Sequence, residues 1–183
     1  MLDIDLRFEN DIEQLNQLFD RFEPNNILGI ARENQPVYRH LLWRYRQENP
    51  QTSVGNPPPN GLTGFNSGVL LLNLDRMRES QEFQRLLNNV SLIEQLRNKY
   101  HFTHPHLGDQ DFYSLLSFEY PNLFFILPCT WNRQLCTWWK GKGYDDVWES
   151  YFNCNNEQNI HLYHGNCNTP IPTARSNEKK VEL

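Results

Sequence analysis

Several features that would reveal a compartment or a partner are missing from this sequence. No apolar run approaches the roughly 18 to 20 residues that span a bilayer. The opening residues, MLDIDLRFEND, lack the basic and then apolar layout of a signal peptide. The longest basic run is Lys179-Lys180, and the net charge is -5. Because so little positive charge is available to attract a phosphate backbone, we expect no nucleic acid partner.

Cysteine is also scarce, and its four positions all fall in the last third of the chain, at Cys129, Cys136, Cys154 and Cys167. No Cys-x-x-Cys pair occurs among them, which argues against a zinc site. An even number in one segment favours disulfides, and free buried thiols are the alternative. The sequon Asn89-Val90-Ser91 and the last four residues, Lys-Val-Glu-Leu, fit an oxidising lumen.

The hydrophobic content predicts one globular unit. The chain has 183 residues, of which 38% are hydrophobic and 13% aromatic, enough for one buried core and hardly for two. We expect this unit to cover residues 1–172 and the tail, residues 173–183, to be disordered. No internal repeat is visible.

The hydrophobic pattern alternates between strands and helices. Strands are predicted to end at Met1-Leu2 and to cover Ile27–Ala31, Phe65–Leu74, Leu123–Leu127 and Ile160–Tyr163. Helices are predicted from Asp11, over Val37–Arg46, from Asp75 to Leu87, over Ser91–Tyr100 and from Asp109 or Asp111 to Phe118. The Pro- and Gly-rich stretch Asn49–Gly64 is predicted to be a surface loop, and the Cys/Trp-rich segment after Leu127 a cap made mainly of loops. This order indicates an α/β fold with a mainly parallel sheet, whose ligands gather beyond the carboxyl ends of the strands.

Acidic residues follow the first apolar segment and open a later helix. Asp3 and Asp5 are spaced so that both carboxylates reach one hard divalent cation, although Asp-x-Asp is also common in surface turns. His164 follows a predicted strand and is either a third ligand or a structural histidine. The segment His106–Asp111 places two carboxylates and an amide at a predicted helix start, where it binds anions or sugar hydroxyls or acts as an ordinary N-cap.

Three tryptophans lie close together among the cysteines: Trp131, Trp138 and Trp139. They either form a wall on which a carbohydrate stacks or fill a core shared with the disulfides.

Four motifs that follow one another in a fixed order indicate a protein family more specifically than any one of them alone. They are Asp3-Ile4-Asp5, Gly64-Phe65-Asn66-Ser67-Gly68-Val69, Leu107-Gly108-Asp109-Gln110-Asp111 and His164-Gly165-Asn166. This set resembles the retaining glycosyltransferase family 8, which includes glycogenin and bacterial galactosyltransferases. The segments Gln35–His40, Cys129–Trp139 and His164–Pro172 resemble the xyloside alpha-1,3-xylosyltransferases within that family.

The resemblance implies a GT-A fold with a mixed, mainly parallel sheet, and a site for Mn²⁺ and UDP-xylose. Asp3, Asp5 and His164 would ligate the metal and, with Asn66, Ser67, Asp109 and Gly165, bind the donor. Asp109 and Gln110 would be the catalytic residues, with Gln110 stabilising an oxocarbenium-like transition state in a front-face reaction. Trp138, Trp139 and Asn166 would contact the acceptor.

The same resemblance implies disulfides that join Cys129 to Cys154 and Cys136 to Cys167. It further implies transfer of xylose in alpha-1,3 linkage to a xylosyl-glucose O-glycan on EGF-like repeats, such as those of Notch, in the lumen of the endoplasmic reticulum. The parent protein would be a single-pass type II membrane protein whose anchor precedes residue 1.

Two departures from the family pattern bear on this expectation. Many members place a phosphate-gripping Lys six residues after the metal-binding His, whereas this chain has Pro170. The nucleotide-binding half that precedes the Asp-x-Asp motif in the family has no counterpart here. The alternative function is therefore a truncated, inactive product that binds the glycan or the EGF-like repeat.

Overall fold

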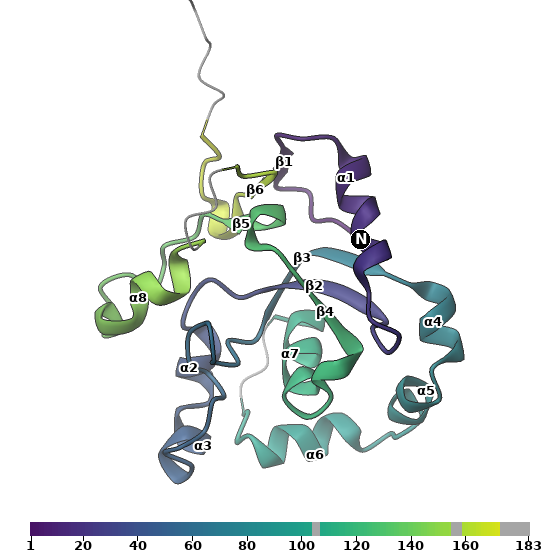
Figure 1. Cartoon of the computed structure of the whole chain (residues 1–183). Coiled ribbons are helices and arrows are strands. Elements are labelled where there is room, and N and C mark those ends of the chain that lie inside the picture. The colour runs from purple at the N-terminus through teal and green to yellow at the C-terminus, as the bar shows by residue number, and fades with distance from the viewer. Residues whose placement is uncertain (104–106, 155–158, 173–183) are drawn as a thin grey trace, which may run out of the picture.

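The computed structural model of this chain describes residues 1–103, 107–154 and 159–172. A three-stranded sheet in the order β3-β2-β4 forms its centre (Figure 1). Its strands are β2 (Leu28–Arg32), β3 (Phe65–Leu72) and β4 (Phe124–Leu127). β2 runs antiparallel to β3 and parallel to β4.

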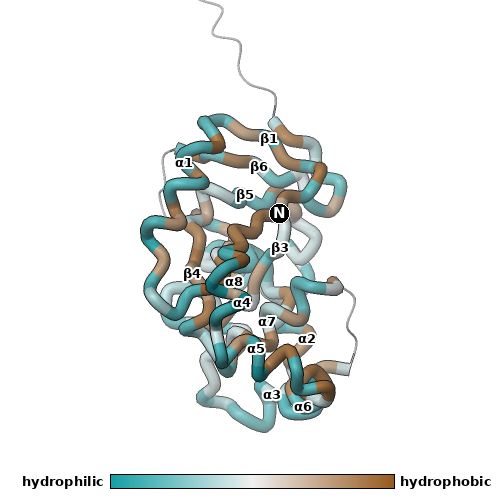
Figure 2. The backbone as a smooth tube through the Cα atoms, turned by 90° about the vertical axis from the view of Figure 1, so that its right-hand side faces the viewer, coloured by the Kyte–Doolittle hydropathy of each residue, from teal (hydrophilic) through white to brown (hydrophobic). Residues whose placement is uncertain are grey.

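A second, smaller sheet has the order β1-β6-β5. Figure 2 shows it at one end of the molecule, with helices α3 (Trp43–Glu48), α5 (Gln81–Leu87) and α6 (Leu92–Lys99) toward the other end. Its strands are β1 (Leu6–Phe8), β5 (Arg133–Gln134) and β6 (Leu162–His164). β6 pairs antiparallel with β1 and parallel with β5. Both sheets are mixed, and among the named strands of the described residues parallel and antiparallel pairings are equally common. The prediction of mixed pairing is confirmed, but parallel pairs do not predominate among these strands. The apolar pattern of a strand does not reveal its direction.

The central sheet is buried on both faces because its side chains alternate. Leu70 of β3 points into a core shared with α7 (Asp109–Glu119), α2 (Val37–Leu41) and α6 (Leu92–Lys99). Val69 and Leu71 point to the other face and pack with Leu15 of α1 (Ile12–Asn16). This alternation at a period of two is what a strand buried on both faces requires.

Two predicted helices are each broken into two. The predicted helix over Val37–Arg46 consists of α2 and α3 (Trp43–Glu48), which are separated by Leu42 with φ -101° and ψ 22°. The predicted helix from Asp75 consists of α4 (Leu74–Glu79) and α5 (Gln81–Leu87). Ser80 separates these two, because its side chain accepts a hydrogen bond from the Phe83 N–H and caps α5. α4 begins at Leu74, one residue before the predicted start at Asp75, and its N-cap is Asn73, whose side chain accepts from the Arg76 N–H.

The two ends of the chain contain the other differences. Met1 and Leu2 are exposed, and Leu2 forms an isolated bridge with Val69, so the strand predicted to end there is reduced to a single bridge. The short strands β1 and β5 and the helix α8 (Asp145–Phe152) were not predicted. The predicted disordered tail, residues 173–183, lies outside the described residues. None of the helices in the described ranges is both long and apolar enough to cross a membrane.

Candidate metal and donor site

The structure brings Asp3, Asp5 and His164 together from opposite ends of the chain. The Asp3 N–H donates to the Gly68 carbonyl at 2.9 Å, which holds Asp3 against the edge of β3. The pairing of β1 with β6 sets Leu6 opposite His164, so Asp5 lies beside the end of β6. His164 Nε2 is 3.4 Å from Asp5 Oδ1 and 3.7 Å from Asp3 Oδ2.

These three side chains have the chemistry and spacing of ligands to one divalent cation. One ligand atom from each lies within 4.8 Å of the other two. Small divalent cations hold oxygen ligands at about 2.0–2.6 Å, so ligands on opposite sides of one ion are about 4–5 Å apart. Two carboxylates and an imidazole suit a Mn²⁺-type ion, because they combine hard oxygen donors with one nitrogen.

His164 is buried and held in one orientation. Its Nδ1 atom lies 3.0 Å from Asn132 Oδ1, which leaves Nε2 facing the two carboxylates. Burial lowers the pKa of His164, while Asp5 and Asp3 act in the opposite direction. Burial raises the pKa of Asp3, against the lowering effect of His164. A neutral imidazole with its Nε2 lone pair toward the carboxylates is the form that binds a metal.

Gly68 of β3 makes room for this imidazole. A Cβ atom at this position would lie 2.3 Å from His164 Cε1, closer than any real contact. The pairing of β2 with β3 also shifts register between Ile30 and Ala31, so that Ala31 pairs with Asn66. This irregularity bends β3 where the Asn66-Ser67-Gly68 motif stands, as β-bulges beside functional sites do.

A cleft of about 410 Å³ opens beside the three side chains. Eight of the residues predicted for the site line it: Asp3, Asp5, Asn66, Gln110, Trp138, Trp139, His164 and Asn166. Ser67, Asp109 and Gly165 are not among the lining residues. Ser67 Oγ and Asp109 Oδ1 are hydrogen-bonded to each other at 3.2 Å at an exposed position. The Gly165 N–H donates to the Asp5 carbonyl at 2.8 Å and is therefore engaged within the protein.

The three tryptophans divide between the cleft and the core. Trp138 is 63% exposed, and Trp139 is half-buried against His40 and Tyr144. Trp131 is buried and stacks on His161, so it belongs to the core and not to a carbohydrate wall.

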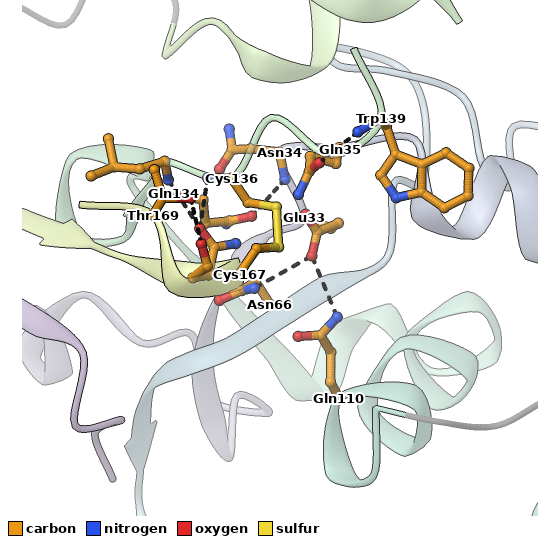
Figure 3. Close-up of a disulfide and its surroundings, with 12 residues drawn as sticks. Glu33, Asn34, Gln35, Asn66, Gln110, Gln134, Cys136, Trp139, Cys167 and Thr169 are labelled. Atoms are coloured by element: carbon orange, nitrogen blue, oxygen red, sulfur yellow. Dashed lines mark hydrogen bonds between the residues drawn. A yellow bond between two sulfur atoms is a disulfide. The ribbon is translucent and has the colours of Figure 1, made fainter. Parts of the chain in front are cut away.

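Both implied disulfides are present, and one of them forms part of the cleft wall. Cys129 is bonded to Cys154 and Cys136 to Cys167. Figure 3 shows the second bridge beside Glu33 and Asn66. Next to it, the Asn166 side-chain oxygen accepts from the N–H groups of Leu135 and Cys136 at 3.0 and 2.9 Å. This bridge therefore ties the segment that carries the cleft tryptophans to the turn after His164.

Glu33 and Asn132 belong to the site and were missed in the sequence. Glu33 is buried in the cleft and contacts both Asn66 and Gln110. Burial raises its pKa to about 7, against the lowering effect of hydrogen bonds from Asn66, Gln110 and two backbone N–H groups. The polar run from Glu33 to Gln35, directly after an apolar strand, was the available signal. Asn132, inside the cysteine segment, gave none.

Comparison with known proteins identifies the family. Residues 1–166 match the model of glycosyl transferase family 8. This chain belongs to glycosyltransferase family 8. It is 59% identical over 171 residues to human Xyloside xylosyltransferase 1 and 57% identical to the mouse protein of that name.

A solved structure extends this family-8 likeness to the fold. The crystal structure of mouse Xyloside xylosyltransferase 1 in its apo form matches with a TM-score of 0.88 at 56% identity, over 93% of this chain and 58% of the mouse chain. The α/β, GT-A-type fold predicted from the motifs is thereby confirmed. The chain spans 42% of the length of the human relative and 43% of the mouse relative.

Proposed function

We propose that this protein is a retaining xylosyltransferase that transfers xylose from UDP-xylose, in alpha-1,3 linkage, to a xylosyl-glucose O-glycan on EGF-like repeats. The carrying observation is that Asp3, Asp5 and His164 converge on one wall of a cleft that also contains Asn66, Gln110 and two tryptophans. The names of the human and mouse relatives support xylose as the transferred sugar.

The reaction first requires that the negative charge on departing UDP be stabilised. Bound Mn²⁺ would supply positive charge that offsets the diphosphate and so stabilises departing UDP. Asp3, Asp5 and His164 would hold the ion, with His164 kept neutral by burial. Pro170 stands where many family members have a phosphate-binding Lys, so the described turn after His164 offers no cation at that position.

The donor sugar would lie against Asn66 and Gln110. Both amides are buried at the cleft, where a fixed dipole acts more strongly than in water. Gln110 would stabilise the positive charge that develops at the anomeric carbon, because its neutral amide is a poor nucleophile but a good preorganised dipole. Ser67 and Asp109, which are joined at the exposed edge, would contact sugar hydroxyls. The acceptor hydroxyl would pass its proton to the departing phosphate on the same face of the sugar.

The acceptor would approach over the tryptophans. Trp138 presents an exposed ring at the cleft, and Trp139 is braced by His40 and Tyr144. Flat sugar faces pack well on such rings. Asn166 would contribute its NH₂ group, because its oxygen is already occupied by two backbone N–H groups.

The lumen of the endoplasmic reticulum is the proposed compartment, with a membrane anchor supplied by sequence before residue 1. Disulfides persist in oxidising compartments, and this chain has two, one of which forms part of the cleft wall. Asn89 of the sequon is exposed between α5 and α6. Microscopy of the tagged gene product, with glycosidase treatment to detect a glycan on Asn89, tests this compartment. A cytosolic distribution would contradict it.

A chimera provides the test of activity. In it, this chain replaces the matching part of mouse Xyloside xylosyltransferase 1, so that the rest of the mouse protein is present. We expect transfer from UDP-xylose with Mn²⁺, loss of transfer in Asp5→Asn, and slower transfer with retained donor binding in Gln110→Ala. Equal transfer from UDP-glucose would contradict the donor assignment.

A further inference from the structure

Glu33 lies directly after β2 and reaches two other elements of the cleft. It is only 3% exposed. Its Oε2 atom accepts hydrogen bonds from Asn66 Nδ2 of β3 and Gln110 Nε2 of α7, each at 3.4 Å (Figure 3). These are the two amides that the proposed function places against the donor sugar. One carboxyl group therefore contacts both.

The far side of each amide is also occupied. Asn66 Oδ1 accepts from the Gly68 N–H at 3.1 Å and from Asn132 Nδ2 at 2.9 Å. Gln110 Oε1 accepts from the Ser67 N–H at 3.3 Å. An amide has NH₂ on one side and oxygen on the other, so a flip would set oxygen against the carboxylate and NH₂ against N–H donors. With Glu33 ionised, each amide has one favourable orientation.

Both amides donate to the Oε2 atom of Glu33, and its buried Oε1 atom has no hydrogen-bond partner among the described residues. Besides the two amides, the backbone N–H groups of Asn34 and Gln35 favour its ionised form. An ionised carboxylate only accepts hydrogen bonds, whereas a protonated carboxyl or a glutamine brings a donor into the same position. Either change removes the negative charge and so weakens both hydrogen bonds from the amides, even when the added hydrogen lies on the unpartnered Oε1 atom.

We propose that ionised Glu33 is a positioning residue, which fixes the orientation of the Asn66 and Gln110 amides without touching the reacting atoms. This inference rests on the proposed function. Burial raises the pKa of Glu33 to about 7, so the group is set to titrate near neutrality. Because the ionised form is the ordering one, kcat should fall as the pH drops through this value.

Other titratable groups surround Glu33 and must be separated from it. They are Tyr38 of α2, Asp109 and Asp111 of α7, Tyr151 of α8, and Asp3, Asp5 and His164 across the cleft. Glu33→Gln removes one titration and leaves these groups in place. Comparing its pH profile with that of the unmodified protein therefore isolates the contribution of Glu33.

The kinetic test uses the chimera at saturating Mn²⁺, from about pH 6 to about pH 8, so that the range brackets the Glu33 pKa. We expect kcat of the unmodified chimera to fall below about pH 7, whereas Glu33→Gln should have a kcat reduced ~10–100-fold at the upper end and level across the range. KM for UDP-xylose should change less than kcat. Glu149→Gln on the exposed face of α8 should behave as unmodified. A Glu33→Gln protein with the unmodified kcat, or with the same acidic fall, would overturn the proposal.

A second readout does not depend on transferase activity. In the 183-residue chain, side-chain NH₂ resonances of Asn66 and Gln110 can be assigned with Asn66→Asp and Gln110→Glu. Both should shift with a shared midpoint near the Glu33 pKa of about 7, and neither should shift in Glu33→Gln. If the chemical shifts of these NH₂ groups do not change with pH, the proposal is overturned, even if the chimera transfers xylose. A shared titration in a protein whose chimera is inactive would uphold the role of Glu33 and reject the proposed function.

Discussion

Asn132 holds His164 in the tautomer that a metal site needs. Its NH₂ group donates to Asn66 Oδ1 at 2.9 Å, so its oxygen faces His164 Nδ1 at 3.0 Å. His164 Nδ1 therefore has the proton, and Nε2 is free for a metal. Partners of this kind fix the ring and raise its basicity in metal sites.

Replacing Asn132 should weaken metal binding. Asn132→Leu keeps the approximate volume but removes the acceptor, so the imidazole loses its preferred tautomer. We expect the dissociation constant for Mn²⁺ to rise ~10–100-fold, measured from the free Mn²⁺ signal in electron paramagnetic resonance. Asn122→Leu, which changes an exposed asparagine hydrogen-bonded to Glu82, is the matched control. Unchanged Mn²⁺ affinity in Asn132→Leu would contradict the role of Asn132.

Gly68→Ala should separate His164 from the two carboxylates. The added methyl group would lie 2.3 Å from His164 Cε1, so the ring must move. We expect Mn²⁺ affinity to fall by at least about 10-fold, as with other losses of support around a ligand. Gly29 lies in β2 of the same sheet, and a Cβ atom there would crowd the Phe22 ring. Gly29→Ala therefore serves as a control for general destabilisation. Equal affinities in the two variants would show that His164 tolerates the methyl group.

Trp138→Ala should act on the acceptor and not on the donor. Trp138 is largely exposed at the cleft, so its removal leaves the core intact. Loss of one aromatic stacking surface, at ~0.5–1.5 kcal/mol, should raise KM for the glycan acceptor up to about 10-fold, with KM for UDP-xylose unchanged. Trp43→Ala, an equally exposed tryptophan on α3, should leave both constants unchanged. A larger effect on the donor than on the acceptor would place Trp138 elsewhere in the site.

Glu33 should also affect stability in a pH-dependent way. Its pKa is raised from 4.5 to about 7 in the folded chain, so the folded state binds the extra proton. The contribution of Glu33 to the free energy of unfolding is therefore lost as the pH rises from its pKa in the unfolded chain to its pKa in the folded chain. Relative to Glu33→Gln, the unfolding free energy of the unmodified chain should fall by about 3 kcal/mol over this range and then level off. Denaturant titrations of both proteins at several pH values measure this difference, and a constant difference would contradict the raised pKa.

The sequence predicted the residues that form the candidate metal site better than the residues that hold them in place. Asp3, Asp5 and His164 were predicted to meet, because ordered motifs mark chain segments whose side chains share one ligand. Asn132 and Glu33 were missed because their roles depend on contacts across 32 to 77 residues of chain. The helix breaks at Leu42 and Ser80 were missed for a local reason: the apolar pattern continues across each break, while backbone angles or a capping hydroxyl end the helix.

Xylose incorporation into an EGF-like repeat that bears xylosyl-glucose tests the central claim most directly. The chimera, supplied with UDP-xylose and Mn²⁺, should add a single pentose detectable by mass spectrometry of the glycopeptide. This addition should disappear in Asp5→Asn and on chelation of the metal. Transfer that persists without metal would contradict the assigned role of Asp3, Asp5 and His164. No transfer by a folded chimera, under conditions in which the intact mouse protein is active, would contradict the proposed function itself.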